Sequence, residues 1–153
     1  MPLVLVAHLA CPALDPGAPS SLSQRIITSI LREELEFGGV VVSDDLEMKA
    51  IAARFDIGEA AVRFLEAGGD LILICHDPGQ QRAAMRAVET ALRNGRLRED
   101  RLASSLDRIA RLRSWLEARH TLIDQEWAQS IVGSADHQRL LRTILAKSPL
   151  ASL

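Results

Sequence analysis

The segment Gly39-Val40-Val41-Val42-Ser43-Asp44-Asp45-Leu46 decides the fold of this chain. Three consecutive valines predict a strand buried on both faces, as in a parallel sheet covered by helices. Residues 3–7 and 71–75 form two further apolar runs of this kind, and a segment with helical spacing follows each of the three. Successive strand–helix units predict an α/β fold with a parallel sheet and right-handed crossovers.

Apolar residues recur at helical spacing in several segments between and after these strands. Ser20 or Ser21 is expected to cap the first helix, and Gly68-Gly69 is expected to end the third. The predicted helices cover residues 22–35, 46–54, 57–67, 80–93, 99–119 and 135–147.

The composition excludes several classes of protein. The chain has 153 residues, of which 48% are hydrophobic and 25% charged, which is typical of a globular domain and not of a disordered segment. No apolar run approaches the roughly 20 residues of a membrane span. A net charge of −2 gives no overall attraction to nucleic acid. Two cysteines and no basic leader segment indicate a reducing compartment, so we expect a cytoplasmic location.

Polar side chains follow all three predicted strands, where parallel sheets bind their ligands. They are His8, the Ser43-Asp44-Asp45 run, and His76-Asp77. Asp44 follows three valines and Ser43 at the end of a strand expected to be buried, so it needs a partner or a task to remain ionised. Helix capping explains Asp45 and Asp77 equally well. No cysteine–histidine spacing indicates a metal, and no glycine loop indicates a phosphate, so neither metal nor cofactor is expected. His120 and His137 lie away from the strand ends.

Longer stretches share a family pattern in their order and spacing: Ala7-His8, Pro12-Ala13-Leu14-Asp15, Leu31-Arg32-Glu33-Glu34-Leu35, Val40 to Met48, and Ala67-Gly68-Gly69-Asp70. In these residues the chain resembles the bacterial β-N-acetylglucosaminidases (β-N-acetylhexosaminidases) of glycoside hydrolase family 3. The resemblance implies a (β/α)8 TIM barrel and a metal-free, retaining glycosidase. It also implies that Asp44 is the nucleophile and that His8, Met48 and His76 bind the carbohydrate substrate. Cytoplasmic family members release N-acetylglucosamine from muropeptides during peptidoglycan recycling.

The chain departs from the family in what it lacks. The family's acid/base loop, of the type Lys-His-Phe-Pro-Gly-His-Gly, is absent from these residues, as are an upstream arginine and Lys-His pair that hold the sugar. A complete barrel takes about 250 residues. We therefore expect a partial barrel, with about three C-terminal βα units in residues 1–95 and a helical extension in residues 96–153 that packs on the same domain. Such a chain is expected to be inactive alone and to need a complementary N-terminal half or self-association.

Two other functions remain open at this point. The chain fits a non-catalytic barrel remnant that oligomerises or binds sugar. More remotely, Asp44 to Met48 resembles the Asp-x-x-Met-Pro pattern of phosphoacceptor signalling domains. Lys49 replaces the proline of that pattern, however, and no lysine ends a later strand.

Overall fold

The computed structural model describes residues 2–119 and 125–146. The chain divides into two compact units, Met1–Ala118 and Arg119–Leu153. The first unit holds all the strands and most of the helices, and the second holds two helices, so each unit is described by itself below.

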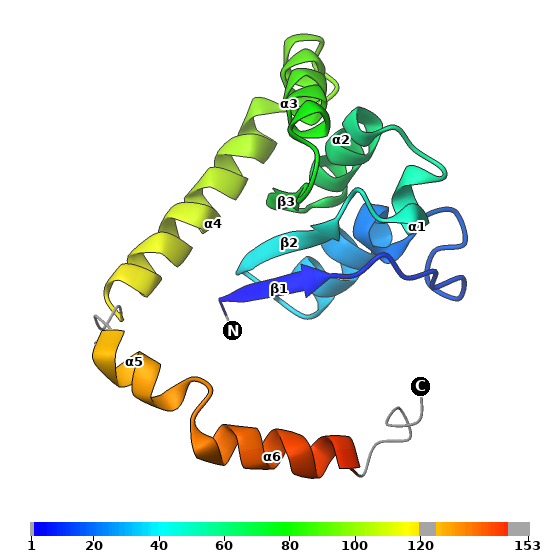
Figure 1. Cartoon of the computed structure of the whole chain (residues 1–153). Helices are drawn as coiled ribbons and strands as arrows, with labels where there is room; N and C mark the ends of the chain where they lie inside the picture. The colour runs from blue at the N-terminus through cyan, green and yellow to red at the C-terminus, as the bar shows by residue number, and fades with distance from the viewer. Residues whose placement is uncertain (1, 120–124, 147–153) are drawn as a thin grey trace. The chain divides into compact units, whose positions relative to one another are not determined.

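The first unit is built on a three-stranded parallel sheet (Figure 1). Its strands are β1 (Leu3–Val6), β2 (Val40–Asp45) and β3 (Leu71–Leu73), in the spatial order β1-β2-β3. Leu3 pairs with Val40, and Val42 pairs with Leu71. The predicted strands, the parallel pairing and the α/β class are confirmed. Closure of the strands into part of a barrel stays a prediction.

The ends of β2 and β3 differ from the prediction for one reason. The pairing of β2 with β3 is irregular between Val42 and Asp45. Here the Leu73 N–H donates to the Ser43 hydroxyl oxygen over 3.0 Å, and the Leu46 N–H donates to the Leu73 carbonyl oxygen over 3.0 Å. A side chain thus replaces a backbone partner in the ladder. β2 consequently runs on to Asp45, so Asp44 lies within the strand, and β3 already ends at Leu73.

The first predicted helix is corrected at its start and in its type. Ser20–Leu22 forms the short 3₁₀ turn η1, and the helix η2 (Arg25–Glu34) follows it with the wide i→i+5 hydrogen bonding of a π-helix. Neither Ser20 nor Ser21 caps η2. The Ser20 hydroxyl donates to the Ala7 carbonyl oxygen over 2.6 Å and thereby fastens this turn to the end of β1.

The remaining helices of the first unit follow the predicted pattern with one exception. The helix predicted over residues 46–54 is reduced to α1 (Lys49–Ala52), because the side chain of Asp45 accepts a hydrogen bond from the Glu47 N–H and holds the preceding residues in a turn. The others are α2 (Ile57–Ala67), α3 (Pro78–Arg93) and α4 (Glu99–Glu117).

α2 ends as predicted at glycine. Gly68 has the left-handed φ of 113° and serves as the C-cap. Asp77 caps α3 as the capping explanation requires, because its Oδ1 accepts the Gly79 N–H over 2.6 Å.

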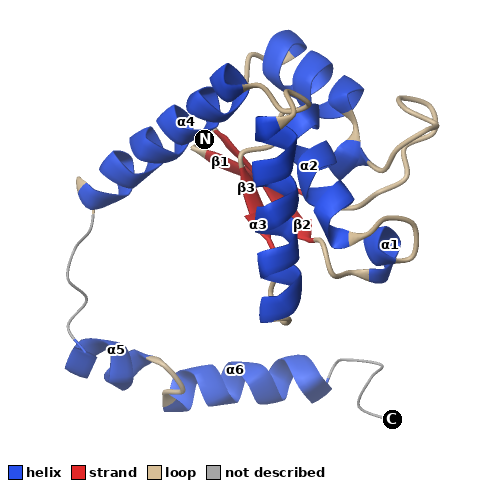
Figure 2. Cartoon of the chain, turned by 90° about the horizontal axis from the view of Figure 1, so that it is seen from above, coloured by secondary structure: helices blue, strands red, loops and turns tan. Residues whose placement is uncertain are grey.

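The hydrophobic core lies on one face of the sheet. Val41 and Phe64, both 0% exposed, pack there with residues of η2, α1, α2 and α3, and Figure 2 shows α2 and α3 lying beside each other. The buried apolar residues of this core are Leu22, Ile27, Val41, Leu46, Ile51, Ala60, Ala61, Val62, Phe64, Leu65, Ala67, Ala84, Ala91 and Leu97.

The opposite face of the sheet carries exposed leucines. Leu5, Val42 and Leu71 are neighbours in the strand register and therefore point to the same face. Leu3, Leu5 and Leu71 are 36%, 50% and 40% exposed, whereas Val42 in the centre is buried. Large apolar side chains are thus exposed on this face of the sheet, next to the two edge strands β1 and β3.

A charged cluster ties α4 to the start of β3. The side chain of Asp70 is fully buried and accepts hydrogen bonds from Arg32 (2.7 Å), Arg108 (2.9 Å) and the Ser105 hydroxyl (2.6 Å). Arg101 lies 3.7 Å from the same carboxylate. Burial alone would raise the pKa of Asp70, but hydrogen bonds from Arg108 and Ser105 outweigh it, and the pKa lies below its ordinary value.

The second unit contains α5 (Gln125–Ile131) and α6 (Ala135–Ala146). The sequence pattern predicts α6 but not α5. Leu140, Leu141, Ile144 and Leu145 are all exposed on α6, and His137 is exposed too. His120 lies outside the described residues. Among the helices that the structure describes, none is both long and apolar enough to cross a membrane.

Candidate functional site

The candidate site is the rim formed by the carboxyl ends of the three strands. His8 follows β1, Asp44 is the second-last residue of β2, and His76 follows β3. The parallel order of the strands brings these segments to the same edge of the sheet, as the sequence predicts. These segments contact one another through Asp45 and not through Asp44.

Asp44 is half-buried at the end of the central strand. Its Oδ1 accepts a hydrogen bond of 2.9 Å from the N–H of the next residue, Asp45. Within residues 2–119 and 125–146, no cation forms an ion pair with Asp44. The Asp44 carboxylate is thus held at the rim by a backbone N–H.

His8 is bound on both sides of its ring. Its Nε2 lies 3.0 Å from the Asp45 carbonyl oxygen, and its Nδ1 lies 2.6 Å from the Ser21 hydroxyl, which is fully buried. A carbonyl oxygen only accepts, so Nε2 carries the proton, and in the neutral imidazole Nδ1 accepts from Ser21. Both ring nitrogens of His8 are therefore engaged within the protein.

His76 belongs to a loop that two carboxylates hold in place. The Glu47 carboxylate accepts the His76 N–H over 2.6 Å and the Asp77 N–H over 3.0 Å. The His76 Nδ1 lies 3.2 Å from Asp45 Oδ2 and 3.3 Å from Glu47 Oε2, although the side chain is 80% exposed. The hydrogen bond from the His76 N–H is the chief reason that the pKa of Glu47 lies below its ordinary value.

Two neighbours complete the rim. Met48 is the N-cap residue of α1, and its side chain is 45% exposed. Cys75 precedes His76 and is exposed, and desolvation together with the nearby charge of Asp45 raises the pKa of its thiol. A thiol with a raised pKa is a poor nucleophile at neutral pH.

Asp45, Glu47 and His76 are also a group that is able to hold a metal ion, since ligand atoms from all three lie within 4.8 Å of one another. Their carboxylate oxygens, however, already accept hydrogen bonds from backbone N–H groups of the loop after β3. These hydrogen bonds link the loop after β2 to the loop after β3, which explains the grouping of the three residues without a metal ion.

Sequence reasoning missed two residues of this site. Ser20 or Ser21 is expected to cap a helix, but the Ser21 hydroxyl instead forms a hydrogen bond with the ring of His8. The sequence pattern does not predict a site role for Glu47, because its partners are backbone N–H groups about thirty positions further along the chain. No local pattern signals that pairing.

The model for the N-terminal domain of glycosyl hydrolase family 3 matches residues 1–112. The chain therefore belongs to this family of glycosidases.

Several similar proteins carry the names β-hexosaminidase or β-N-acetylglucosaminidase. A β-hexosaminidase of Idiomarina loihiensis is 34% identical over 125 residues, which cover 78% of this chain and 38% of that protein. A family 3 β-N-acetylglucosaminidase from Paenibacillus sp. FPU-7 matches in structure with a TM-score of 0.74 and 38% identity, over 81% of this chain. The β-N-acetylglucosaminidase of Thermotoga maritima matches with a TM-score of 0.67, 32% identity and 71% coverage of this chain.

The matches cover only part of each relative. This chain spans 38% of the Idiomarina protein, 26% of the Paenibacillus enzyme and 24% of the Thermotoga enzyme. The activities named for those proteins belong to the whole proteins.

Proposed function

We propose that this chain supplies the nucleophile of a retaining β-N-acetylhexosaminidase. The observation that carries the proposal is the place of Asp44, a half-buried carboxylate without an ion-pair partner among the described residues, at the carboxyl end of the central strand in a family 3 chain. In a retaining mechanism an oxygen of Asp44 attacks the anomeric carbon of a terminal N-acetylglucosamine while the aglycone leaves with a proton. Water then hydrolyses the glycosyl-enzyme and restores the carboxylate.

We place the proton donor of this mechanism outside the described residues. A second group is required at about 5–5.5 Å from the nucleophile in the usual two-carboxylate arrangement. His8 has both ring nitrogens engaged, and the Nδ1 of His76 faces Asp45 and Glu47. Neither histidine is assigned as the acid/base, so the isolated chain is expected to be inactive.

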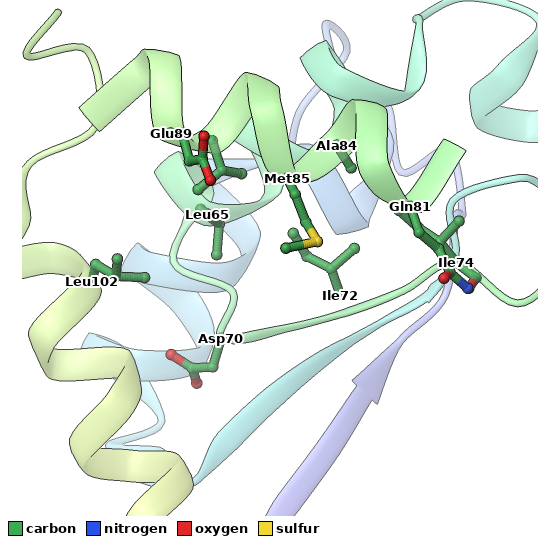
Figure 3. Close-up of a pocket in the computed structure, with 10 residues that line it drawn as sticks. Leu65, Asp70, Ile72, Ile74, Gln81, Ala84, Met85, Glu89 and Leu102 are labelled. Atoms are coloured by element: carbon green, nitrogen blue, oxygen red, sulfur yellow. The ribbon is translucent and has the colours of Figure 1, made fainter. Parts of the chain in front are cut away.

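We assign the missing group to the βα units of a family 3 barrel that this chain does not contain, whether joined to it or on a separate chain. Two surfaces support this occupant. One is the open sheet face with Leu3 and Leu5, and the other is a groove of about 560 Å³ beside the edge strand β3 (Figure 3). Ile72 of β3 and Met85 of α3, the latter 64% exposed, line this groove with other mainly apolar side chains.

The substrate class and location complete the proposal. The names of the relatives support a terminal β-N-acetylglucosaminide as substrate. The family resemblance adds muropeptides of peptidoglycan recycling as the natural source and the cytoplasm as the location.

The test measures hydrolysis of 4-nitrophenyl β-N-acetylglucosaminide. We expect no hydrolysis by the 153-residue chain alone. Hydrolysis is expected when the chain is combined with the remaining part of the Paenibacillus barrel, produced separately. Asp44→Ala should then lower the rate by about 10³-fold or more. Azide should restore the release of 4-nitrophenol by attacking the anomeric carbon in place of the missing carboxylate.

Asp100→Asn is the matched control, because Asp100 is an exposed carboxylate on α4 that pairs with Arg98. This variant should keep full activity. Full activity of Asp44→Ala in the combined enzyme would overturn the assignment of the nucleophile. Turnover by the isolated chain, lost in Asp44→Ala, would overturn the need for a complement. If the folded parts bind but remain inactive, the proposed reaction is wrong, and if this chain only pairs with itself, the proposed occupant is wrong.

A further inference from the structure

Three rim segments meet on the backbone and side chain of one residue, Asp45. Its carbonyl oxygen accepts hydrogen bonds from His8 Nε2 and from the Met48 N–H, each over 3.0 Å. The first of these bonds joins the segment after β1 to the end of β2. The second closes the turn that leads into α1.

The carboxylate of Asp45 joins the third segment. Its Oδ1 accepts the Glu47 N–H over 3.1 Å and the Cys75 N–H over 3.3 Å. Its Oδ2 lies 3.2 Å from His76 Nδ1. The Asp45 side chain is only 15% exposed, and hydrogen bonds to a charged group are stronger than those between neutral groups.

The remaining polar group of Asp45, its N–H, donates to Asp44 Oδ1 over 2.9 Å. Every polar group of Asp45 thus has a partner. One of these contacts, the hydrogen bond from its N–H, holds a carboxylate oxygen of the proposed nucleophile. Helix capping does not explain the arrangement, because α1 begins only at Lys49 with Met48 as its N-cap.

We infer that Asp45 is a positioning residue for Asp44, which locks the segments after β1, β2 and β3 together and so holds the Asp44 carboxylate in one orientation. The inference rests on the proposed function. Attack on an anomeric carbon needs the reacting atoms aligned within a few tenths of an ångström, and a misplacement of 1 Å costs about 10²-fold in rate. Among the described residues no cation pairs with Asp44, so the hydrogen bond from its neighbour holds its orientation.

The first test uses the 153-residue chain and needs no activity. Three-bond couplings measured by NMR report the χ1 rotamer of Asp44, and hydrogen exchange reports the amides of Glu47 and Cys75, which both donate to Asp45 Oδ1. Wild type should show one rotamer. Asp45→Ala should show averaged rotamers and exchange at these amides that is about 10 to 100 times faster, as expected for loss of a hydrogen bond to a charged group.

Asp45→Asn is the conservative variant, because its amide oxygen is still able to accept from Glu47 and Cys75. It should restore the single Asp44 rotamer, and Asp100→Asn should change nothing. Asp45→Ser replaces the alanine variant if the latter does not fold, which circular dichroism decides. A single Asp44 rotamer in a folded Asp45→Ala or Asp45→Ser variant would overturn the inference.

The second test measures kinetics in the combined enzyme described above. Asp45→Ala should lower kcat by about 10 to 100 times with KM changed less than twofold, since substrate binding is retained and alignment is lost. An unchanged kcat would also overturn the inference. If the wild-type enzyme shows no activity, the proposed function fails, and the rotamer measurement still decides whether Asp45 orients Asp44.

Discussion

The hydroxyl of Ser105 on α4 donates a hydrogen bond of 2.6 Å to Asp70 Oδ1 at the start of β3. Both residues are buried, and the same carboxylate also forms ion pairs with Arg32 and Arg108. α4 is therefore held to the sheet by a charged cluster at the end opposite to the candidate site. In parallel α/β sheets this end serves stability, while the carboxyl end serves binding and chemistry.

Removing the charge of Asp70 should destabilise the first unit strongly. Asp70→Asn leaves Arg32, Arg101 and Arg108 close together without their counter-charge, and breaking a buried pair of this kind costs about 3–5 kcal/mol. Urea unfolding followed by circular dichroism measures the loss. Asp100→Asn, which breaks an exposed pair with Arg98, should cost less than about 1 kcal/mol. Equal losses in the two variants would contradict the assigned role of Asp70.

The stability contributed by Glu59 should depend on pH. Hydrogen bonds from Arg96 and Arg63 lower the pKa of Glu59 from 4.5 to about 2. The folded state therefore binds the proton more weakly than the unfolded state, and the contribution is complete above the unfolded pKa and lost as the pH falls from 4.5 to 2. Because the carboxylate is 28% exposed, solvent screening limits the contribution to about 1 kcal/mol.

Urea unfolding of wild type and Glu59→Gln at several pH values checks this sign. Wild type should be more stable by about 1 kcal/mol at pH 7, and the difference should shrink steadily below pH 4.5. A difference that stays constant down to pH 2.5 would show that this carboxylate keeps no depressed pKa.

Gly69→Ala should destabilise the core, because a Cβ at this position would overlap the ring of Phe64, which is fully buried. Overpacking of this kind costs about 1–3 kcal/mol. Gly38→Ala is the control, since a Cβ there meets nothing within 4 Å, and its effect should stay within about 0.5 kcal/mol. Thermal unfolding of the two variants compares them, and a Gly69 variant as stable as wild type would mean that the ring of Phe64 moves aside freely.

His8→Ala should cost about 1–3 kcal/mol, because it leaves the buried Ser21 hydroxyl without its imidazole partner. His137→Ala changes an exposed histidine on α6 and should leave the unfolding of the first unit unaffected. The comparison is made by urea unfolding monitored through residues of the first unit. A His8 variant of unchanged stability would indicate that this side chain is reserved for substrate alone.

The sequence pattern predicts the architecture well, since continuous apolar runs and helical spacing locate all three strands and the long helices. It fails where a side chain replaces a backbone partner. Ser43 enters the ladder between β2 and β3, and Asp45 holds a turn where helical spacing continues, so β2 is longer and α1 shorter than predicted. The exchange at Ser43 joins residues 30 positions apart, which no local pattern contains, whereas the turn at Asp45 joins residues 2 positions apart and competes locally with the helical spacing.

The site shows the same limit. Position at the strand ends correctly brings His8, Asp44 and His76 to one edge. It does not show that Asp45 collects the contacts of both histidines, because a carbonyl oxygen takes part as well as a carboxylate. Main-chain acceptors carry no signature in the sequence.

The strand order β1-β2-β3 also determines how this sheet is assembled in time. Each strand pairs only with its neighbour in the chain, so every pairing closes the loop of a single strand–helix unit and no strand waits for a distant partner. During synthesis each pairing becomes available as soon as the next strand leaves the ribosome. The pairing order of the first unit thus allows its strand–helix units to form one after another.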